Sequence, residues 1–173
     1  MNEIYHMEEI PGFPDYYISP SGTIFSFRLN PDGIPLRPMR NQQGILSVLL
    51  WNPDGQACRR AIAPLVVDTF IPPHQYPHYN ESLIHLDGDK SNCFAENLMR
   101  RPRWFALKYH RQFYDAPEEW MYKPIVMEST GEVFDRAIDC CVKYGLLISH
   151  IMESLGNPSP TPVQPVWSTF RRP

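Results

Sequence analysis

The sequence predicts an α+β protein in which short strands form hairpins and short helices follow them. Apolar runs of strand length end at turn sequences, of which Asn52–Gly55 (NPDG) and Asp87–Asp89 (DGD) are the clearest. The 19 prolines among 173 residues favour short elements joined by irregular connections. A hydrophobic content of 43% is enough to build a folded core.

The composition argues against a membrane protein, a secreted protein and a cysteine-bound zinc site. No apolar run approaches the length of about 20 residues that a membrane helix needs, and the acidic start lacks a signal-peptide core. Cys58 and Cys93 stand alone and Cys140 adjoins Cys141, so the sequence has no CxxC pair for zinc and we expect no disulfides. These features predict an intracellular, cytoplasmic protein with no membrane partner and no small-molecule substrate.

The net charge does not indicate nucleic-acid binding, but one local cluster of basic residues is compatible with it. The chain carries a net charge of −3 and has a pI of about 6.0, whereas proteins that bind nucleic acid are usually basic. One basic cluster without acidic residues lies between residues 100 and 111 and fits phosphate contact, although a solvated charged face explains it equally well. The cluster contains Arg100, Arg101, Arg103, Lys108 and Arg111.

Strands and turns alternate through the first half of the chain. Residues 8–27 predict a hairpin around a Ser-Pro-Ser-Gly turn, and the polar, Pro-rich residues 29–43 predict a loop. Gly44–Trp51 and the segment that follows NPDG predict a second hairpin. It passes into a short helix at Pro64–Phe70, and residues 72–82 predict a loop.

The candidate catalytic residues lie in the centre of the chain. Leu83–Leu98, LIHLDGDKSNCFAENL, predicts a hairpin, and residues 102–113 predict a helix. A histidine with a pKa near 6.5 can take a proton from water. A divalent cation held by oxygen or nitrogen ligands can neutralise the charge that develops when a phosphodiester bond is cut.

This stretch resembles the ββα-metal site, or His-Me finger, of HNH endonucleases: a histidine, an apolar residue, DGD, Lys, an Asn and then Glu-Asn-Leu. The resemblance implies that His85 is the base, that Asn97 orients it and that Asn92 is structural. It also implies that His85 and Asn97 converge from facing strands, and that the helix packs across the hairpin through Trp104, Phe105 and Leu107.

The metal positions of the family do not match this sequence. The residue before the base is Ile84, which has no donor atom, and the helix position of the second ligand falls on Ala106. A longer loop would let His110 reach the site instead. The sequence therefore predicts no metal ligand and no cofactor, with Mg²⁺ or Mn²⁺ required only if the site is active.

Two flanking stretches extend the resemblance to phage and intron-type HNH homing endonucleases. Residues 10–26, IPGFPDYYISPSGTIFS, resemble the family's N-terminal NUMOD-type module. Residues 65–72, LVVDTFIP, resemble the segment that precedes the HNH hairpin. The order of these elements predicts an N-terminal module at 1–43, an HNH-like core at 44–114 and a C-terminal module at 115–173.

The C-terminal module begins, after a linker at 115–122, with a predicted hairpin around Thr130-Gly131. Two short predicted helices follow: the first begins at Asp135 and ends at Gly145, and the second spans Ser149–Leu155. The module resembles the helix-turn-helix repeat of the same endonucleases, which implies that the second helix reads DNA. Base contacts would fall to Ser149, His150 and Ser154. A packing module without DNA contact is the alternative, and Trp167 with Phe170 predicts a final strand.

Two functions follow. The first is an HNH-endonuclease-like protein with a degenerate catalytic site, which acts by binding DNA or a protein assembly, for instance a viral one. The alternative is an active, metal-dependent, DNA-nicking HNH homing endonuclease with His85 as general base. Ile84, Ala106 and the net negative charge favour the first and a catalytically inactive protein.

Overall fold

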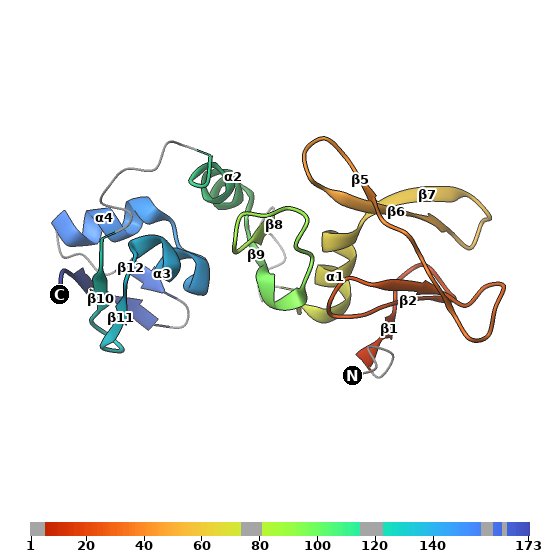
Figure 1. Ribbon diagram of the computed structural model, residues 1–173, viewed down its shortest axis with the longest axis horizontal. Coiled ribbons are helices and arrows are strands. Elements are labelled where there is room, and N and C mark those ends of the chain that lie inside the picture. The colour runs from red at the N-terminus through yellow and green to blue at the C-terminus, as the bar shows by residue number, and fades with distance from the viewer. Residues whose placement is uncertain (1–5, 74–80, 115–122, 157–160, 164–165) are drawn as a thin grey trace. The chain divides into compact units, whose positions relative to one another are not determined.

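The protein folds into two compact units, Met1–Arg103 and Trp104–Pro173. The structure is a computed structural model that describes residues 6–73, 81–114, 123–156, 161–163 and 166–173 (Figure 1). The predicted α+β class is confirmed, since antiparallel sheets and four α-helices make up the described residues. None of the helices in these ranges combines the length and apolar character that a bilayer crossing requires. The predicted linker at 115–122 and most of the loop at 72–82 lie outside the described residues, and the division into three modules stays a prediction.

The first unit begins with a four-stranded antiparallel sheet in the order β1-β2-β3-β4. Register pairs such as Tyr17 with Phe25 confirm the hairpin predicted for residues 8–27. Its turn depends on Gly22, which has a φ of +84°, and a Cβ there would lie 3.0 Å from the Cβ of Cys93. Any larger residue would therefore strain the backbone and push against the core. The strands are Glu8–Glu9, Tyr16–Ile18, Ile24–Ser26 and Ile34–Pro35.

A three-stranded antiparallel sheet follows, formed by β5 (Met39–Arg40), β6 (Leu46–Trp51) and β7 (Ala57–Ala61). The predicted NPDG turn joins β6 to β7, and the Gly55 N–H donates to the carbonyl of Asn52 at 3.0 Å with a φ of +76° at the glycine. The prediction of a plain loop at 29–43 was wrong, because β4 and β5 lie within it. Both strands have two exposed residues, so neither carries a pattern of alternating burial.

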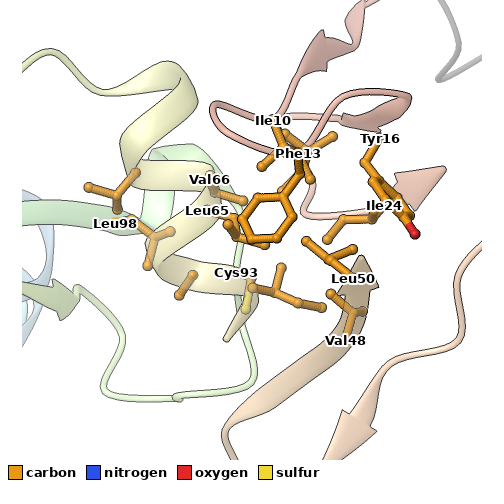
Figure 2. Close-up of a cluster of buried hydrophobic side chains, with 14 residues drawn as sticks. Ile10, Phe13, Tyr16, Ile24, Val48, Leu50, Leu65, Val66, Cys93 and Leu98 are labelled. Atoms are coloured by element: carbon orange, nitrogen blue, oxygen red, sulfur yellow. The ribbon is translucent and has the colours of Figure 1, made fainter. Parts of the chain in front are cut away.

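Helix α1 (Ile62–Phe70) joins the two sheets through one hydrophobic core. It begins two residues before the predicted start, and Pro64 lies in its first turn, where a helix leaves backbone N–H groups unpaired in any case. Figure 2 shows Leu65 and Val66 of α1 with Phe13 from the turn between β1 and β2, Ile24 of β3 and Leu50 of β6. These side chains are almost fully buried, so the core fixes α1 relative to both sheets.

The predicted central hairpin and helix are present. Strands β8 (Glu81–His85) and β9 (Leu98–Pro102) pair antiparallel, and the loop between them ends in a short 3₁₀ turn, η2 (Ala95–Asn97). Helix α2 (Arg103–Arg111) follows β9 directly. The hairpin loop is thus much longer than a two-residue Asp-Gly turn.

The second unit places a small sheet beside helices α3 (Ala137–Tyr144) and α4 (Ile148–Gly156). The sheet order is β11-β10-β14, so the predicted C-terminal strand pairs with β10 and buries Phe170. Gly145 ends α3 as predicted, in the left-handed conformation with φ 61° and ψ 48°. The strands of this unit are β10 (Ile125–Met127), β11 (Glu132–Phe134), β12 (Thr161–Val163), β13 (Val166–Ser168) and β14 (Phe170–Arg171).

Helix α2 packs within the second unit through a face that the sequence did not identify. Trp104 and Leu107 were predicted to be buried, but they are 56% and 66% exposed. Phe105 and Tyr109 are buried instead, and the Tyr109 hydroxyl donates to the carbonyl of Cys141 at 3.2 Å. The side-chain amide of Gln112 adds bonds to the backbone that joins α3 to α4.

The four cysteines are free thiols. Burial raises the pKa of the Cys93 thiol to about 11 and that of Cys140 to about 12. Burial also raises the pKa of Cys141 well above its usual value. These three cysteines act as small apolar side chains of the two cores, because their reactive thiolate forms are strongly disfavoured.

Candidate functional site

His85 is the last residue of β8, and its side chain is only 5% exposed. Its backbone carbonyl accepts the N–H of Gly88 at 3.0 Å, and Gly88 has a φ of +79°. The chain therefore turns sharply after the histidine, which lies opposite Leu98 in the register of the hairpin. A buried imidazole at the end of a strand, beside a tight turn, is held in a defined position.

Asn97 holds the hairpin loop closed. Its side-chain Nδ2 donates to Asp87 Oδ1 at 3.0 Å and to the carbonyl of Asn92 at 2.9 Å, and its Oδ1 accepts the Asp87 N–H at 3.1 Å. The prediction that Asn97 lies on the strand facing His85 was wrong by one residue, because Asn97 ends η2. The structure brings its amide to Asp87 and Asn92.

Asp87 is the centre of this loop, and the sequence reasoning did not assign it a role. Its Oδ2 accepts a bond from Asn92 Nδ2 at 2.7 Å, and its Oδ1 also accepts the backbone N–H of Asp89 at 2.8 Å. The signal was present in the sequence, since an aspartate before glycine commonly binds the backbone two residues on. We call the side chains of Asp87, Asn92 and Asn97 the loop lock.

Asp89 contributes the next turn of the loop. Its Oδ1 accepts the backbone N–H and the hydroxyl of Ser91 at 2.8 and 2.7 Å. These bonds hold the pKa of the Asp89 carboxyl below its usual value, and the charges of Arg40 and His85 make smaller contributions in the same direction. The loop beside His85 is thus shaped by carboxylates and amides that bind one another.

Replacing Asn97 with alanine is expected to lower the free energy of unfolding by about 1–2 kcal/mol, because Asp87 and Asn92 lose their shared partner. Hydrogen exchange at the Asp87 amide should become faster than in the unmodified protein. Asn97→Asp is the matched control: it keeps the shape but sets a carboxylate against Asp87, so it should destabilise at least as much. An unchanged rate of hydrogen exchange at the Asp87 amide in Asn97→Ala would show that the loop lock does not hold the loop closed.

The HNH fold implies a divalent cation beside the histidine, and the residues present do not fit one. Ile84, directly before His85, offers only carbon atoms, and its side chain is fully buried. The position expected for a helix ligand is Ala106, which is also buried. Across the parts of the chain that the structure describes, no three His, Cys, Asp or Glu side chains lie together as metal ligands would. His110, the alternative ligand of the sequence analysis, lies half-buried on α2.

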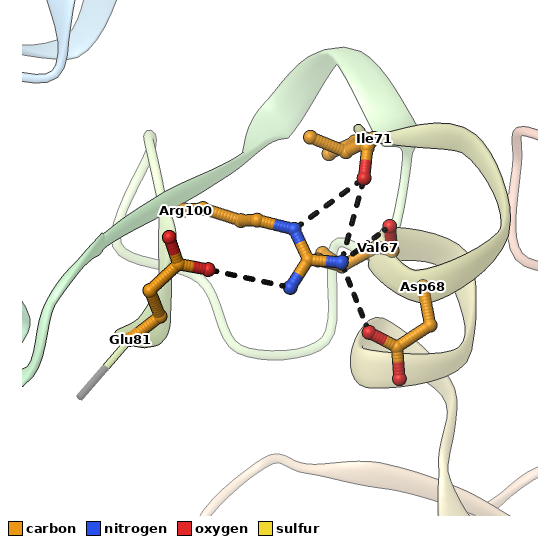
Figure 3. A network of polar contacts seen from close by, with 5 residues as sticks. All are labelled: Val67, Asp68, Ile71, Glu81 and Arg100. Atoms are coloured by element: carbon orange, nitrogen blue, oxygen red, sulfur yellow. Dashed lines mark hydrogen bonds and ion pairs between the residues drawn. The ribbon is translucent and has the colours of Figure 1, made fainter. Parts of the chain in front are cut away.

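Arg100 was predicted to contact phosphate, but its guanidinium is held inside the first unit (Figure 3). It lies 3.0 Å from the Asp68 carboxylate and 3.7 Å from that of Glu81. It also donates to the backbone carbonyls of Val67 and Ile71, at the end of α1. The side chain is 20% exposed. Arg100 therefore caps α1 and joins it to the hairpin.

Replacing Arg100 with alanine is expected to lower the free energy of unfolding by about 1–3 kcal/mol, because two backbone carbonyls lose their donor. Arg100→Lys should recover little, since an ammonium cannot reproduce the guanidinium fork. Asp68→Asn should cost less than ~1 kcal/mol, because Asp68 is 60% exposed and water screens the pair. Urea unfolding measures all three. A variant that keeps full stability but loses DNA affinity would restore Arg100 as a phosphate contact.

The other basic residues lie nearby or on α2. Arg101 is half-buried on β9, whereas Arg103, Lys108 and Arg111 are exposed. At 100° per residue, these three share one side of the helix with Trp104, opposite the buried face. The Lys108 Nζ lies 5.7 Å from the centre of the Trp104 ring. Helix α2 thus presents a basic and partly aromatic face to solvent.

On α4, the predicted base-reading residues differ in exposure. Ser149 is exposed and His150 is half-buried, with its ring edge-on to Phe105 at 6.4 Å between centroids. Ser154 was included wrongly: it is 2% exposed, and its hydroxyl accepts the N–H of Phe170 at 3.1 Å. Ser154 therefore anchors the C-terminal strand and cannot reach a base.

The succession β8, η2, β9 and α2, with a histidine at the end of β8 and a loop closed by asparagines, defines an HNH-type α+β fold. Among solved structures, the chain is similar to the HNH homing endonuclease I-HmuI, in a structure that concerns the DNA binding and cleavage of that enzyme. The two chains are 18% identical with a TM-score of 0.53, and the likeness covers 96% of this chain and 97% of that one. At 18% sequence identity, this structural similarity establishes the fold alone. No family model matches the sequence, and no curated protein matches it.

Proposed function

We propose that this protein binds duplex DNA and does not cleave it. The observation that supports DNA binding is the similarity to the DNA-binding enzyme I-HmuI, which covers 96% of this chain and 97% of that one. The exposed basic face of α2 supports the same reading, since Arg103, Lys108 and Arg111 can each neutralise a phosphate. Ser149 and His150 of α4 supply polar contacts in this proposal.

The absence of cleavage in this proposal rests on Ile84. A fully buried aliphatic side chain occupies the position where the family carries a metal ligand, and carbon cannot coordinate a cation. Phosphodiester hydrolysis by this class of site needs the cation as well as the base, so His85 alone cannot supply the reaction. The side-chain bonds of the loop lock hold the hairpin loop in shape.

The active nicking endonuclease is the second candidate, and the ordered position of His85 beside the loop lock favours it. In that case His85 acts as general base, and a ligand such as His110 completes a Mg²⁺ or Mn²⁺ site. The two candidate functions differ only in DNA cleavage, since both proteins would bind DNA.

The test combines binding and cleavage in one preparation of the full chain. Fluorescence anisotropy with a labelled duplex should show binding at low salt that weakens steeply as salt is raised. Supercoiled plasmid with Mg²⁺ or Mn²⁺ should remain uncut. Nicking that disappears in His85→Ala would overturn the non-cleaving part, and absence of duplex binding at low salt would overturn the DNA-binding part.

A further inference from the structure

A groove in the first unit lies between the two N-terminal sheets. Leu29, Ile34 and Leu36 line one side, from the end of β3 to the residue after β4, and Leu49 with Trp51 lines the other side from β6. The volume of the groove is about 610 Å³. The Tyr16 hydroxyl accepts the backbone N–H of Trp51 at 3.3 Å and so ties the two sheets together. This bond holds the two walls of the groove together.

The lining of this groove is unusually apolar for a surface. Leu29 is 94% exposed, Ile34 and Leu49 are each 47% exposed, and Trp51 is 44% exposed. Isolated apolar residues are normal on a protein surface, but a cluster of large ones in a concave site marks a place where a partner binds. Covering such side chains stabilises a complex by about 25 cal/mol for each Å² of apolar surface removed from water.

Two arginines, Arg28 and Arg59, lie at the same groove. Residues 27–61 contain five arginines and two aspartates, a net charge of +3 in a chain whose total is −3. Arg28 lines the groove, and Arg59 lies opposite Leu49 in the sheet register, so both side chains emerge on one face. The Arg59 guanidinium lies 3.7 Å from the sulfur of Met39 on that face. A partner that fits is therefore anionic as well as apolar.

We propose that this groove docks an acidic protein segment that carries large apolar side chains. Apolar side chains of the segment occupy the space between Ile34 and Trp51, and its carboxylates pair with Arg28 and Arg59. DNA fits less well, because large apolar side chains make up most of the lining and protein–DNA interfaces are more polar. A second copy fits less well too, because a two-fold contact would set these arginines against themselves.

The experiment uses two displayed peptide libraries selected on the full-length protein. Both carry Leu, Ile, Phe or Trp at alternate positions; the first has Asp or Glu between them and the second has Lys or Arg. We expect enrichment from the acidic library alone. Peptides so obtained should bind Leu49→Ser/Trp51→Ser at least 10-fold more weakly. Val133→Ser, which alters an exposed apolar residue of the second unit, should bind them unchanged.

A charge-reversed variant keeps the test decisive if the apolar variant fails to fold. Arg28→Glu/Arg59→Glu should lose the acidic peptides and enrich the basic library. No enrichment from the acidic library, or peptide binding that survives both variants, overturns the proposal. The proposal is also overturned if the groove variants bind duplex DNA more weakly, because that result assigns this face to DNA. It is overturned as well if the unmodified protein is a dimer that Leu49→Ser/Trp51→Ser dissociates, because that result assigns the groove to a second copy. Failure of duplex binding in the unmodified protein concerns only the DNA proposal.

Discussion

Replacing Ile84 with aspartate is expected to lower the free energy of unfolding by at least ~3 kcal/mol, because a carboxylate would replace a fully buried aliphatic side chain. Urea unfolding measures the loss. Ile84→Val is the matched control and should cost only about 1 kcal/mol, since it removes one methylene group from the same place. The contrast separates the cost of the charge from the cost of the lost volume.

The same aspartate variant also tests the metal site. Mn²⁺ should recover part of the lost stability only if other ligands lie within reach of position 84, and Ala106→Asn in the same chain should then increase the recovery. We expect no recovery in Ile84→Asp alone, because one carboxylate is a weak ligand set. An Ile84→Asp protein that is as stable as the unmodified one and melts at a higher temperature with Mn²⁺ would show that a latent metal site exists.

Removing the basic face of α2 is expected to reduce duplex affinity by roughly two to three orders of magnitude at low salt, since each lost phosphate contact also removes the release of a counterion. In Arg103→Ala/Lys108→Ala/Arg111→Ala, the slope of log affinity against log salt should become shallower by about 3. All three side chains are exposed, so the helix should remain folded, which circular dichroism verifies.

The matched control removes the same net charge from another part of the chain. Lys123→Ala/Arg171→Ala/Arg172→Ala alters three exposed basic residues that do not lie on α2. Its salt slope should stay close to that of the unmodified protein. Equal losses in the two triple variants would mean that net charge, and not the face of α2, governs binding.

Local features of the fold could be predicted because local sequence determines them. The turns at Gly22 and Gly55 and the end of α3 at Gly145 each need a backbone conformation that glycine adopts without strain. The hairpin at β8 and β9 followed from an apolar run and a turn sequence. Strands β4 and β5 were missed, because two-residue strands with exposed side chains have no readable period.

Features that depend on distant contacts could not be predicted. Helix α2 has apolar residues on both sides, so the sequence alone does not say whether Trp104 or Tyr109 faces the core. Arg100 looked like a surface charge because its partner Asp68 lies 32 residues away in the chain. The role of Asn97 was inferred from a family pattern, and its position one residue before β9 turned its amide toward Asp87.

The loop lock has an evolutionary consequence. The side-chain bonds of the loop lock run among residues of the loop from Leu86 to Asn97. These bonds are thus made by residues other than Ile84, the position at which HNH endonucleases carry a metal ligand. A lineage can therefore change the residue at position 84 and keep these bonds, and selection can then act on the surface of the domain. An enzyme fold built in this way is well suited to become a binding protein.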